Sequence, residues 1–287
     1  MSRDNLTVAL VLNHGRQRAV ELARRATDWL AARGHHVRVP DDDARAAGLG
    51  EHSCPPGEVG AGAHLAVSLG GDGTMLRTLG LVAAADVPVL GVNLGRLAYL
   101  AHVEPEALTD AFERFAAGDY LVEERLLLCV QVADTSSEDA THLALNEAVV
   151  EKPSAGQVVN VAVHVDGRFF TSYAADGLIV ATPTGSTAYA FSARGPIIDP
   201  TLRALLLTPV SPHMAFDRSL VFCPDQSLRL EVLDRPAMLI VDGRELGLLD
   251  AGASITCTAA GQVARFVTFA PSDFYGVLKA KFGLADR

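Results

Sequence analysis

Residues 65–74 have the sequence Leu-Ala-Val-Ser-Leu-Gly-Gly-Asp-Gly-Thr, which predicts a strand, a tight turn and the start of a helix. Leu65 to Leu69 is an apolar run of strand length, and helical spacing of apolar residues follows from Thr74 to Ala84. The three glycines in residues 70–73 let the backbone approach a ligand and leave amide donors uncovered. The stretch therefore predicts a parallel sheet with a phosphate site at the carboxyl end of this strand.

Asp72 is the one non-glycine side chain inside this turn. A carboxylate next to a phosphate repels it unless it has another task, such as accepting a proton from a hydroxyl nucleophile or helping to hold Mg²⁺. A structural turn in which Asp72 caps the helix is the alternative. The turn by itself leaves both interpretations open.

The first 120 residues alternate segments with strand and helix patterns, which predicts an α/β domain with a parallel sheet. The expected strands are Leu6–Leu12, His35–Pro40, Leu65–Leu69 and Val87–Val92, and the expected helices are Arg16–Arg33, Thr74–Ala84 and Glu104–Ala117. The intervening segment Asp41–Ala63 contains three consecutive aspartates, two prolines and several glycines. We expect an exposed loop there, with a flap over a site as the alternative.

After Asp119 the apolar period changes to two, which predicts a β-rich domain over residues 121–269. Val159 to Val165 alternates apolar and polar residues, Asp166-Gly167 is a hairpin turn signal, and Leu228 to Val232 repeats the alternation. A last helix is expected over Asp273–Phe282. The sequence thus predicts two domains with a boundary near residue 120.

Composition excludes several classes of protein. The 287 residues are 49% apolar and carry a net charge of −10, which is globular and disfavours nucleic-acid binding. No apolar run reaches the ~20 residues of a membrane span, and Asn13 and His14 follow the first apolar run in place of a cleavage site. The four cysteines are widely separated, so we expect a cytoplasmic protein. No lysine precedes Lys152, which excludes a P-loop lysine near the glycine turn.

A second dense patch follows Asp176, with the sequence Asp-Gly-Leu-Ile-Val-Ala-Thr-Pro-Thr-Gly-Ser-Thr-Ala-Tyr-Ala-Phe-Ser over residues 176–192. Hydroxyl groups crowd the start of a short helix there, and with its free amides they suit a purine ring beside Tyr189, although an ordinary helix cap is the alternative. Asn146-Glu147 pairs an amide with a carboxylate, which suits the two hydroxyls of a ribose. Taken alone, that pair is better explained as a solvated strand edge.

Together these segments resemble the NAD kinases along nearly the whole chain. The matching motifs, in order, are Gly70–Thr74, Asn146-Glu147, Asp176–Ser192, Pro209–His213 and Val241–Gly243. The resemblance implies an α/β N-terminal domain, diacylglycerol-kinase-like, with a parallel sheet and helices. It also implies a β-rich, NAD-binding C-terminal domain, a cleft between the two, and a C-terminal helix (residues 270–287) that returns to the first domain.

The resemblance further implies phosphorylation of the 2′-hydroxyl of the adenosine ribose of NAD, with ATP or polyphosphate as donor and a divalent metal, expected to be Mg²⁺. Homo-oligomers, dimers or tetramers, are implied as well. The roles implied for individual residues are Asp72 as general base, Gly71 and Gly73 beside the dinucleotide, Asn146 and Glu147 on the nicotinamide-side ribose, Asp176 on the carboxamide, Thr184, Thr187, Ala188 and Tyr189 around the adenosine, and Ser192 and Ser211 as further contacts.

The chain departs from the usual family pattern at Ala98, Tyr99, Gln157, Arg194 and Arg244. A protein of net charge −10 that binds two polyanions needs local cations. The candidates are Arg77, Arg96, Arg125 and Arg194, with Arg77 first because it follows the glycine turn by one helical turn. A surface ion pair is the alternative role for each arginine.

Two other functions remain open at this point. A lipid kinase of the diacylglycerol or sphingosine kinase type shares the glycine turn but has no need of Asn146-Glu147. A catalytically silent NAD-binding sensor would bind NAD without forming NADP. Donor preference and the use of NADH are not determined by the sequence.

Overall fold

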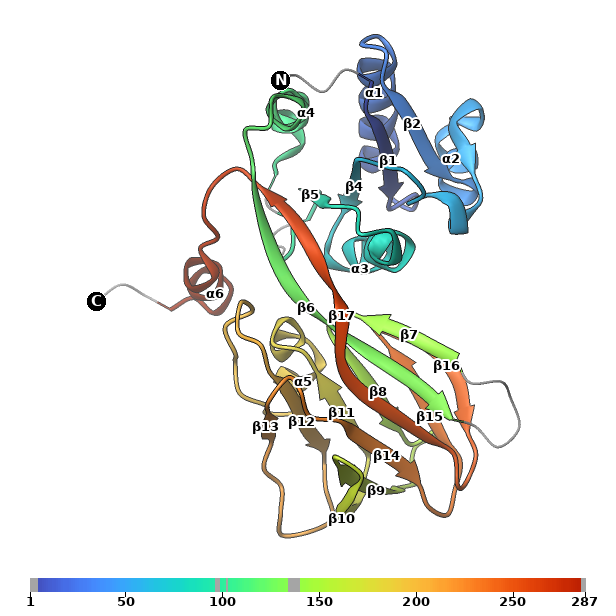
Figure 1. The fold of residues 1–287 in the computed structure, drawn as a ribbon, viewed down its shortest axis with the longest axis vertical. Coiled ribbons are helices and arrows are strands. Elements are labelled where there is room, and N and C mark those ends of the chain that lie inside the picture. Colours follow the sequence, from blue (N-terminus) through green and yellow to red (C-terminus); the bar gives the residue numbers. More distant parts are fainter. Residues whose placement is uncertain (1–4, 96–98, 102, 134–139, 285–287) are drawn as a thin grey trace. The chain divides into compact units, whose positions relative to one another are not determined.

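The computed structural model describes residues 5–95, 99–101, 103–133 and 140–284 (Figure 1). It contains two compact units, residues 1–124 with 264–287, and residues 125–263. The predicted boundary near residue 120 falls at the start of strand β6 (Leu121–Ala133). Strands β6 and β17 (Ser254–Thr268) each run from one unit into the other.

The first unit is built on a parallel sheet with the strand order β5-β4-β1-β2-β3, and the end of β17 pairs in parallel with β5. Its strands besides β6 and β17 are β1 (Thr7–Leu12), β2 (His36–Pro40), β3 (Ser53–Cys54), β4 (Leu65–Gly70) and β5 (Val89–Asn93). Its α-helices are α1 (Gln17–Ala31), α2 (Asp41–Ala47), α3 (Asp72–Val82), α4 (Leu108–Ala117) and α6 (Phe274–Phe282). Its described residues also form the short 3₁₀ turns η1 (Gly50–His52), η2 (Pro56–Glu58), η3 (Ala83–Ala85) and η4 (Pro105–Ala107).

Strand β4 lies between β1 and β5, and every one of its residues is buried. Burial on both faces is typical of parallel strands that helices cover, and it explains the unbroken apolar run. Leu65, Val67 and Leu69 share one core with buried residues of β1, α1 and α4. This packing fixes the end of β4, where the glycine turn begins.

The prediction of an exposed loop over Asp41–Ala63 is wrong. Helix α2 begins directly after Pro40 and ends at Gly48, whose φ of 66° is left-handed. Three acidic residues in its first turn favour the helix because they lie at the positive end of its dipole. Short segments η1, β3 and η2 follow, and β3 extends the parallel sheet. Asp43 is completely buried, which a surface loop would not explain.

The second unit contains two antiparallel sheets. The six-stranded sheet has the order β13-β12-β11-β8-β15-β16, and the other contains β10-β9-β14-β17 with β6 and β7. The strands are β7 (Ala140–Ala144), β8 (Glu147–Glu151), β9 (Val159–Val165), β10 (Arg168–Ala175), β11 (Gly177–Ala181), β12 (Leu205–Val210), β13 (Leu220–Phe222), β14 (Leu228–Val232), β15 (Ala237–Val241) and β16 (Arg244–Leu249). One 3₁₀ turn, η5 (Thr184–Thr187), and one short helix, α5 (Tyr189–Ser192), follow β11.

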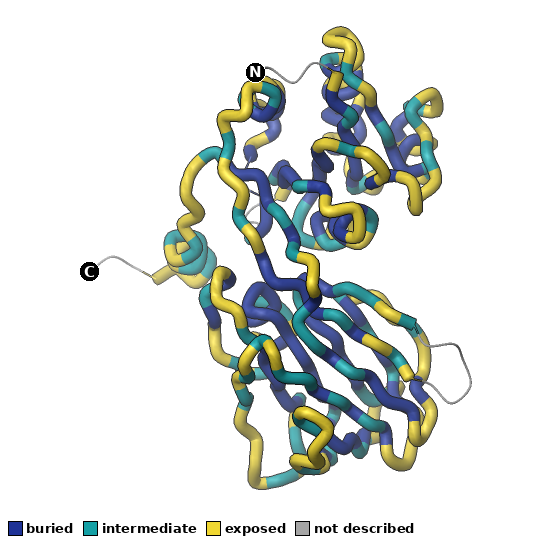
Figure 2. Tube along the Cα trace, viewed as in Figure 1, coloured by how far each residue is buried: buried dark blue, intermediate teal, exposed yellow. Residues whose placement is uncertain are grey.

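Strand β11 is buried along its whole length because it packs on both of its faces. Leu178 and Val180 lie in a core that residues of both sheets form, whereas Ile179 and Ala181 pack with Ala190 of α5. Figure 2 shows how buried residues follow the strands. This two-sided burial places η5 and α5 directly after the end of β11.

Two Asp-Gly pairs form the same kind of hairpin turn. The predicted turn at Asp166-Gly167 joins β9 to β10 with φ angles of 50° and 75°, and the prediction is confirmed. Asp242-Gly243 joins β15 to β16 with φ angles of 47° and 75°. Two left-handed residues in succession match a type I′ turn, in which Asn and Asp tolerate the first position and Gly the second.

Candidate functional site

The glycine turn joins β4 to α3, and the helix begins at Asp72, two residues earlier than expected. Gly71 is the N-cap and has extended backbone angles. A Cβ at Gly70 would lie 2.1 Å from the Thr74 hydroxyl oxygen, so only glycine fits at that position. The turn is therefore close-packed on its own helix and leaves Gly71 and Gly73 open, since nothing would contact a Cβ there.

The Asp72 carboxylate does not cap α3. Its Oδ1 accepts hydrogen bonds from the backbone N–H groups of Tyr99 and Leu100, both at 3.1 Å, and its Oδ2 is 3.2 Å from the Tyr99 nitrogen. A segment far along the chain thus holds this side chain in place. The remaining acceptor positions on Oδ2 are available to a proton or a cation.

Lys281 of α6 lies over the ring of Tyr99, with Nζ 3.3 Å from the ring centroid. Burial lowers the pKa of Lys281, and the Asp72 carboxylate opposes that change. Burial and the nearby Asp72 raise the pKa of Tyr99. Tyr99 thus connects Asp72 to helix α6. Its backbone N–H donates to the Asp72 carboxylate, and its ring contacts Lys281.

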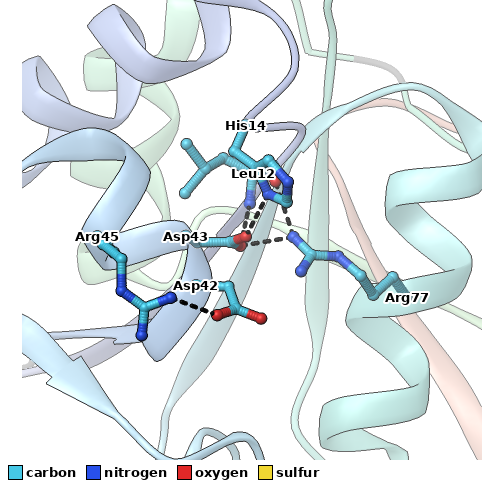
Figure 3. A network of polar contacts seen from close by, with 6 residues as sticks. All are labelled: Leu12, His14, Asp42, Asp43, Arg45 and Arg77. Atoms are coloured by element: carbon cyan, nitrogen blue, oxygen red, sulfur yellow. Dashed lines mark hydrogen bonds and ion pairs between the residues drawn. The ribbon is translucent and has the colours of Figure 1, made fainter.

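Arg77 lies on α3 and contacts a buried carboxylate (Figure 3). Its Nη2 donates to Asp43 Oδ2 at 2.5 Å and to the Leu12 carbonyl at 2.7 Å, and its side chain is 39% exposed. Asp43 also accepts from the Leu12 N–H at 3.0 Å and lies 3.1 Å from His14 Nδ1. The buried charge of Asp43 is therefore paired, and Arg77 is held in one position.

A pocket of about 400 Å³ opens beside this network. It is lined by Leu12, Asn13, His14, Arg16, Gly71, Gly73, Thr74 and Arg77. Two arginines, a histidine and the first backbone amides of a helix are groups that bind anions. The first unit thus brings together Gly71, Gly73 and Arg77 of the predicted set, with Asp72 on the same turn.

In the second unit, Leu145 and Asn146 form the turn from β7 to β8, Glu147 is the first residue of β8, and this turn packs against η5. The Thr182 N–H donates to the Asn146 carbonyl at 2.8 Å, and the Thr182 hydroxyl donates to the Leu145 carbonyl at 2.5 Å. The Gly185 N–H in turn donates to the Thr182 hydroxyl. Hydrogen bonds therefore connect segment 145–147 to segment 182–185, and both segments contain residues predicted to bind NAD.

Glu147 is only 7% exposed, and its Oε2 has no hydrogen-bond partner within the described part of the chain. Burial, and to a smaller extent the charge of Asp242, raise the pKa of Glu147 to about 8, while the Tyr189 N–H acts in the opposite direction. A buried, unpaired carboxyl oxygen is costly unless a ligand supplies a donor. The geometry therefore fits a binding residue and excludes the solvated strand edge.

Glu147→Gln should stabilise the free protein at alkaline pH. Because the folded pKa of about 8 exceeds the ordinary 4.5, the folded state holds a proton that the unfolded chain releases. Stability therefore falls as pH rises from about 4.5 to 8, by a few kcal/mol. Urea unfolding at pH 5, 7 and 9 should show the variant gaining on the wild type with pH, with the exposed Glu245→Gln as control. Parallel curves would contradict this.

Asp176 lies beyond the opposite end of β11 from Glu147. Its carboxylate pairs with Lys152 at 2.7 Å. Tyr189 connects the two ends, because its N–H donates to the Glu147 carboxyl and its hydroxyl donates to Glu151 Oε2 at 3.4 Å. Strand β8 between Glu147 and Glu151 spans roughly 13 Å, a length suited to an extended dinucleotide.

The other predicted residues of this unit lie in or near η5 and α5, except Ser211. Thr184 is buried and accepts from Arg125 at 3.4 Å, while Thr187 donates to the Thr184 carbonyl. Ala188 is half-buried and Ser192 exposed. Ser211 follows β12 and has a φ of 45°. Arg96 and Ala98 lie outside the described residues.

Two residues to which the sequence analysis gave no role hold predicted residues in place, one in each unit. Asp43 anchors Arg77, and Asp242 accepts hydrogen bonds from the backbone N–H groups of residues 145, 146 and 147. The Asp-Gly hairpin signal at Asp242 was visible in the sequence, but no local pattern indicates which distant backbone a carboxylate contacts.

Comparison with known proteins identifies the family. The model of the ATP-NAD kinase N-terminal domain matches residues 8–120, and that of the C-terminal domain matches residues 145–269. The chain belongs to the NAD kinase family. It is 40% identical to NAD kinase 1 of Streptomyces avermitilis (97% of this chain, 87% of that protein) and 41% identical to the NAD kinase of Heliobacterium modesticaldum (96% and 98%).

Solved structures share the fold of this chain. Yeast NADH kinase complexed with NADH has a TM-score of 0.92 at 24% identity, over 99% of this chain and 89% of that one. An NAD kinase from Archaeoglobus fulgidus in complex with ATP has a TM-score of 0.74 at 26% identity, over 98% and 100%. The predicted fold class is confirmed, and the chain is a phosphotransferase that acts on NAD. A lipid kinase and a silent sensor are not favoured.

Proposed function

We propose that this NAD kinase transfers the terminal phosphoryl group of ATP to the 2′-hydroxyl of the adenosine ribose of NAD, with Asp72 accepting the hydroxyl proton. The observation that carries this proposal is the Asp72 carboxylate at the glycine turn, fixed by the N–H groups of Tyr99 and Leu100. A positioned carboxylate suits a loose phosphoryl transition state, in which orientation gives most of the help.

The pocket beside the turn is the place for the donor phosphates. Gly71 and Gly73 let phosphate oxygens approach the backbone amides, and Arg16, His14 and Arg77 line the same pocket. These groups recognise phosphate oxygens and not a base, so polyphosphate suits the pocket as well as ATP does.

The residues at the turn fit a divalent cation that arrives with the donor. Mg²⁺ is commonly bound by one or two carboxylates together with substrate phosphates, so it does not need a cage of protein ligands. Among the described residues no cluster of three His, Cys, Asp or Glu could hold a metal, and Asp72 is the carboxylate at the turn. Bound there, Mg²⁺ would neutralise charge on the transferring phosphoryl group.

The dinucleotide binds to the second unit in this proposal. Glu147 and Asn146 take the nicotinamide-side ribose, because the buried Glu147 Oε2 needs a donor and a ribose offers two hydroxyls. Asp176 takes the carboxamide, and Thr184, Thr187, Ala188 and Tyr189 surround the adenosine, with Ser192 and Ser211 as outer contacts. Tyr189 is 37% exposed and presents a ring on which a purine can stack.

Formation of NADP tests the proposal directly. Purified protein should convert NAD to NADP with ATP and Mg²⁺, and should form none without a donor. Parallel reactions with polyphosphate and with NADH as acceptor define both specificities, and chelation of the metal should abolish turnover. Binding of NAD without any NADP formation under these conditions would refute the proposal.

A homo-oligomer in the cytoplasm completes the proposal. The second unit has open sheet edges at β10, β13 and β16, with exposed apolar residues Phe169, Val221 and Leu248 on those strands. Edges of this kind are often covered by a second copy. Sedimentation at micromolar concentration should show a dimer or tetramer; a monomer would contradict this.

All four cysteines are free, as in a reducing compartment. Among the described residues no helix has both the length and the apolar character to span a membrane.

A further inference from the structure

One carboxylate outside the predicted set organises the turn that carries Asn146 and Glu147. Asp242 Oδ2 accepts from the Leu145 N–H at 2.7 Å, and its Oδ1 accepts from the Asn146 and Glu147 N–H groups at 2.8 and 3.1 Å. The Asp242 N–H returns a bond to the Glu147 carbonyl at 3.0 Å. Three successive backbone donors thus converge on one side chain from another strand pair.

These bonds leave the Glu147 side chain held but incompletely paired. Its backbone is fixed on both sides by Asp242, and the Tyr189 N–H donates to its carboxyl. Its Oε2 is buried and has no partner within the described residues. An unpaired oxygen in a fixed position is an acceptor ready for a hydroxyl donor.

We propose that Asp242 is a positioning residue for NAD binding, which fixes the turn at residues 145–147 and so holds the buried Glu147 carboxyl where ribose hydroxyls can donate to it. This inference rests on the proposed role of Glu147 in NAD binding. In this proposal Asp242 acts on Glu147 through the backbone bonds and through its charge.

The electrostatics support this arrangement. Burial is the largest cause of the raised pKa of Glu147, and the charge of Asp242 from the β15–β16 turn adds to it. The backbone N–H of Tyr189 from α5 opposes the rise. The pKa of Asp242 is itself raised by burial, while its three backbone donors oppose that change. Ionised Glu147 accepts from both ribose hydroxyls, so NAD binding should release a proton and tighten as pH rises towards about 8.

Asp242→Asn tests the proposal, with the Kd for NAD measured by calorimetry from pH 6 to 9. Asn is well tolerated before Gly243 in this turn, and it keeps an acceptor for two of the three N–H groups, so the variant should fold. We expect the variant to bind NAD roughly tenfold more weakly at pH 9, because it has lost one of the three hydrogen bonds that fix the turn. The difference should shrink towards pH 6, because removing a negative neighbour lets Glu147 ionise at lower pH.

Two further variants separate the roles of charge and position. Asp242→Glu keeps the charge but moves the carboxylate, so affinity should fall while the pH dependence stays that of the wild type. Asp166→Asn changes the equivalent residue of the exposed Asp166-Gly167 turn, and it should leave Kd and its pH dependence unchanged.

The outcomes distinguish this inference from the proposed function. The inference is supported if all variants form NADP with nearly unchanged kcat and only Asp242→Asn shows a pH-dependent loss of NAD affinity. If Asp242→Asn has the wild-type Kd at every pH, or loses NAD affinity by the same factor at every pH, the inference is overturned while the kinase activity is unaffected. A wild-type protein that forms no NADP would instead refute the proposed function.

Discussion

Asp72→Asn should lower kcat by a factor of roughly 10² to 10⁴, the loss expected when a positioned general base is removed. Folding and NAD affinity should change little. Both bonds from Tyr99 and Leu100 reach Oδ1, so an asparagine oriented with its oxygen there keeps them. The amide nitrogen at the other position cannot accept a proton, and it also gives up the longer 3.2 Å contact with the Tyr99 N–H and the negative charge.

Steady-state rates of NADP formation, with thermal unfolding and NAD calorimetry on the same samples, measure this effect. Asp110→Asn is a matched control, because Asp110 also lies in the first turn of a helix of the same unit. Raising Mg²⁺ separates the two roles of a carboxylate, since a metal ligand would be partly rescued and a base would not. A folded Asp72→Asn enzyme with near-normal kcat would leave the turn with a purely structural role.

Gly185→Ala should destabilise the protein by about 3 kcal/mol or more, which lowers Tm by roughly 6–12 °C. A Cβ at residue 185 would lie 2.1 Å from the Asn146 carbonyl oxygen and 2.6 Å from its carbon. Both are backbone atoms, so the turn at residue 146 must move away from η5. NAD affinity should fall as well, because the displaced turn carries Asn146 and Glu147.

Thermal unfolding and NAD calorimetry check this prediction, and Gly261→Ala is the control. Nothing lies within 4 Å of a Cβ at Gly261, and its φ is not left-handed, so the control should stay within about 0.5 kcal/mol of the wild type. Equal Tm values for the two variants would show that the structure accommodates a side chain at residue 185. Lost NAD affinity with an unchanged Tm would mean that the turn moves at no cost to folding.

Local patterns were sufficient for most of the elements. The apolar run and glycines of residues 65–74 predicted the β4–α3 unit, and Asp166-Gly167 predicted its hairpin. These succeeded because strand burial, helix periodicity and left-handed turn residues act over a few neighbouring positions. The same logic failed for Asp41–Ala47, where prolines and glycines further along suggested a loop although the acidic first turn favoured a helix.

The sequence by itself determined the two kinds of domain, the glycine turn with Asp72, and the motif at Asn146-Glu147. Only the tertiary structure decided which groups these carboxylates contact. The amides of residues 99 and 100 hold Asp72, the buried Asp43 holds Arg77, and Asp242 holds residues 145–147. The partners in these contacts are separated by 27 to 97 residues. A hydrogen bond between such distant positions depends on how strands are placed in a sheet, and no local propensity encodes that placement.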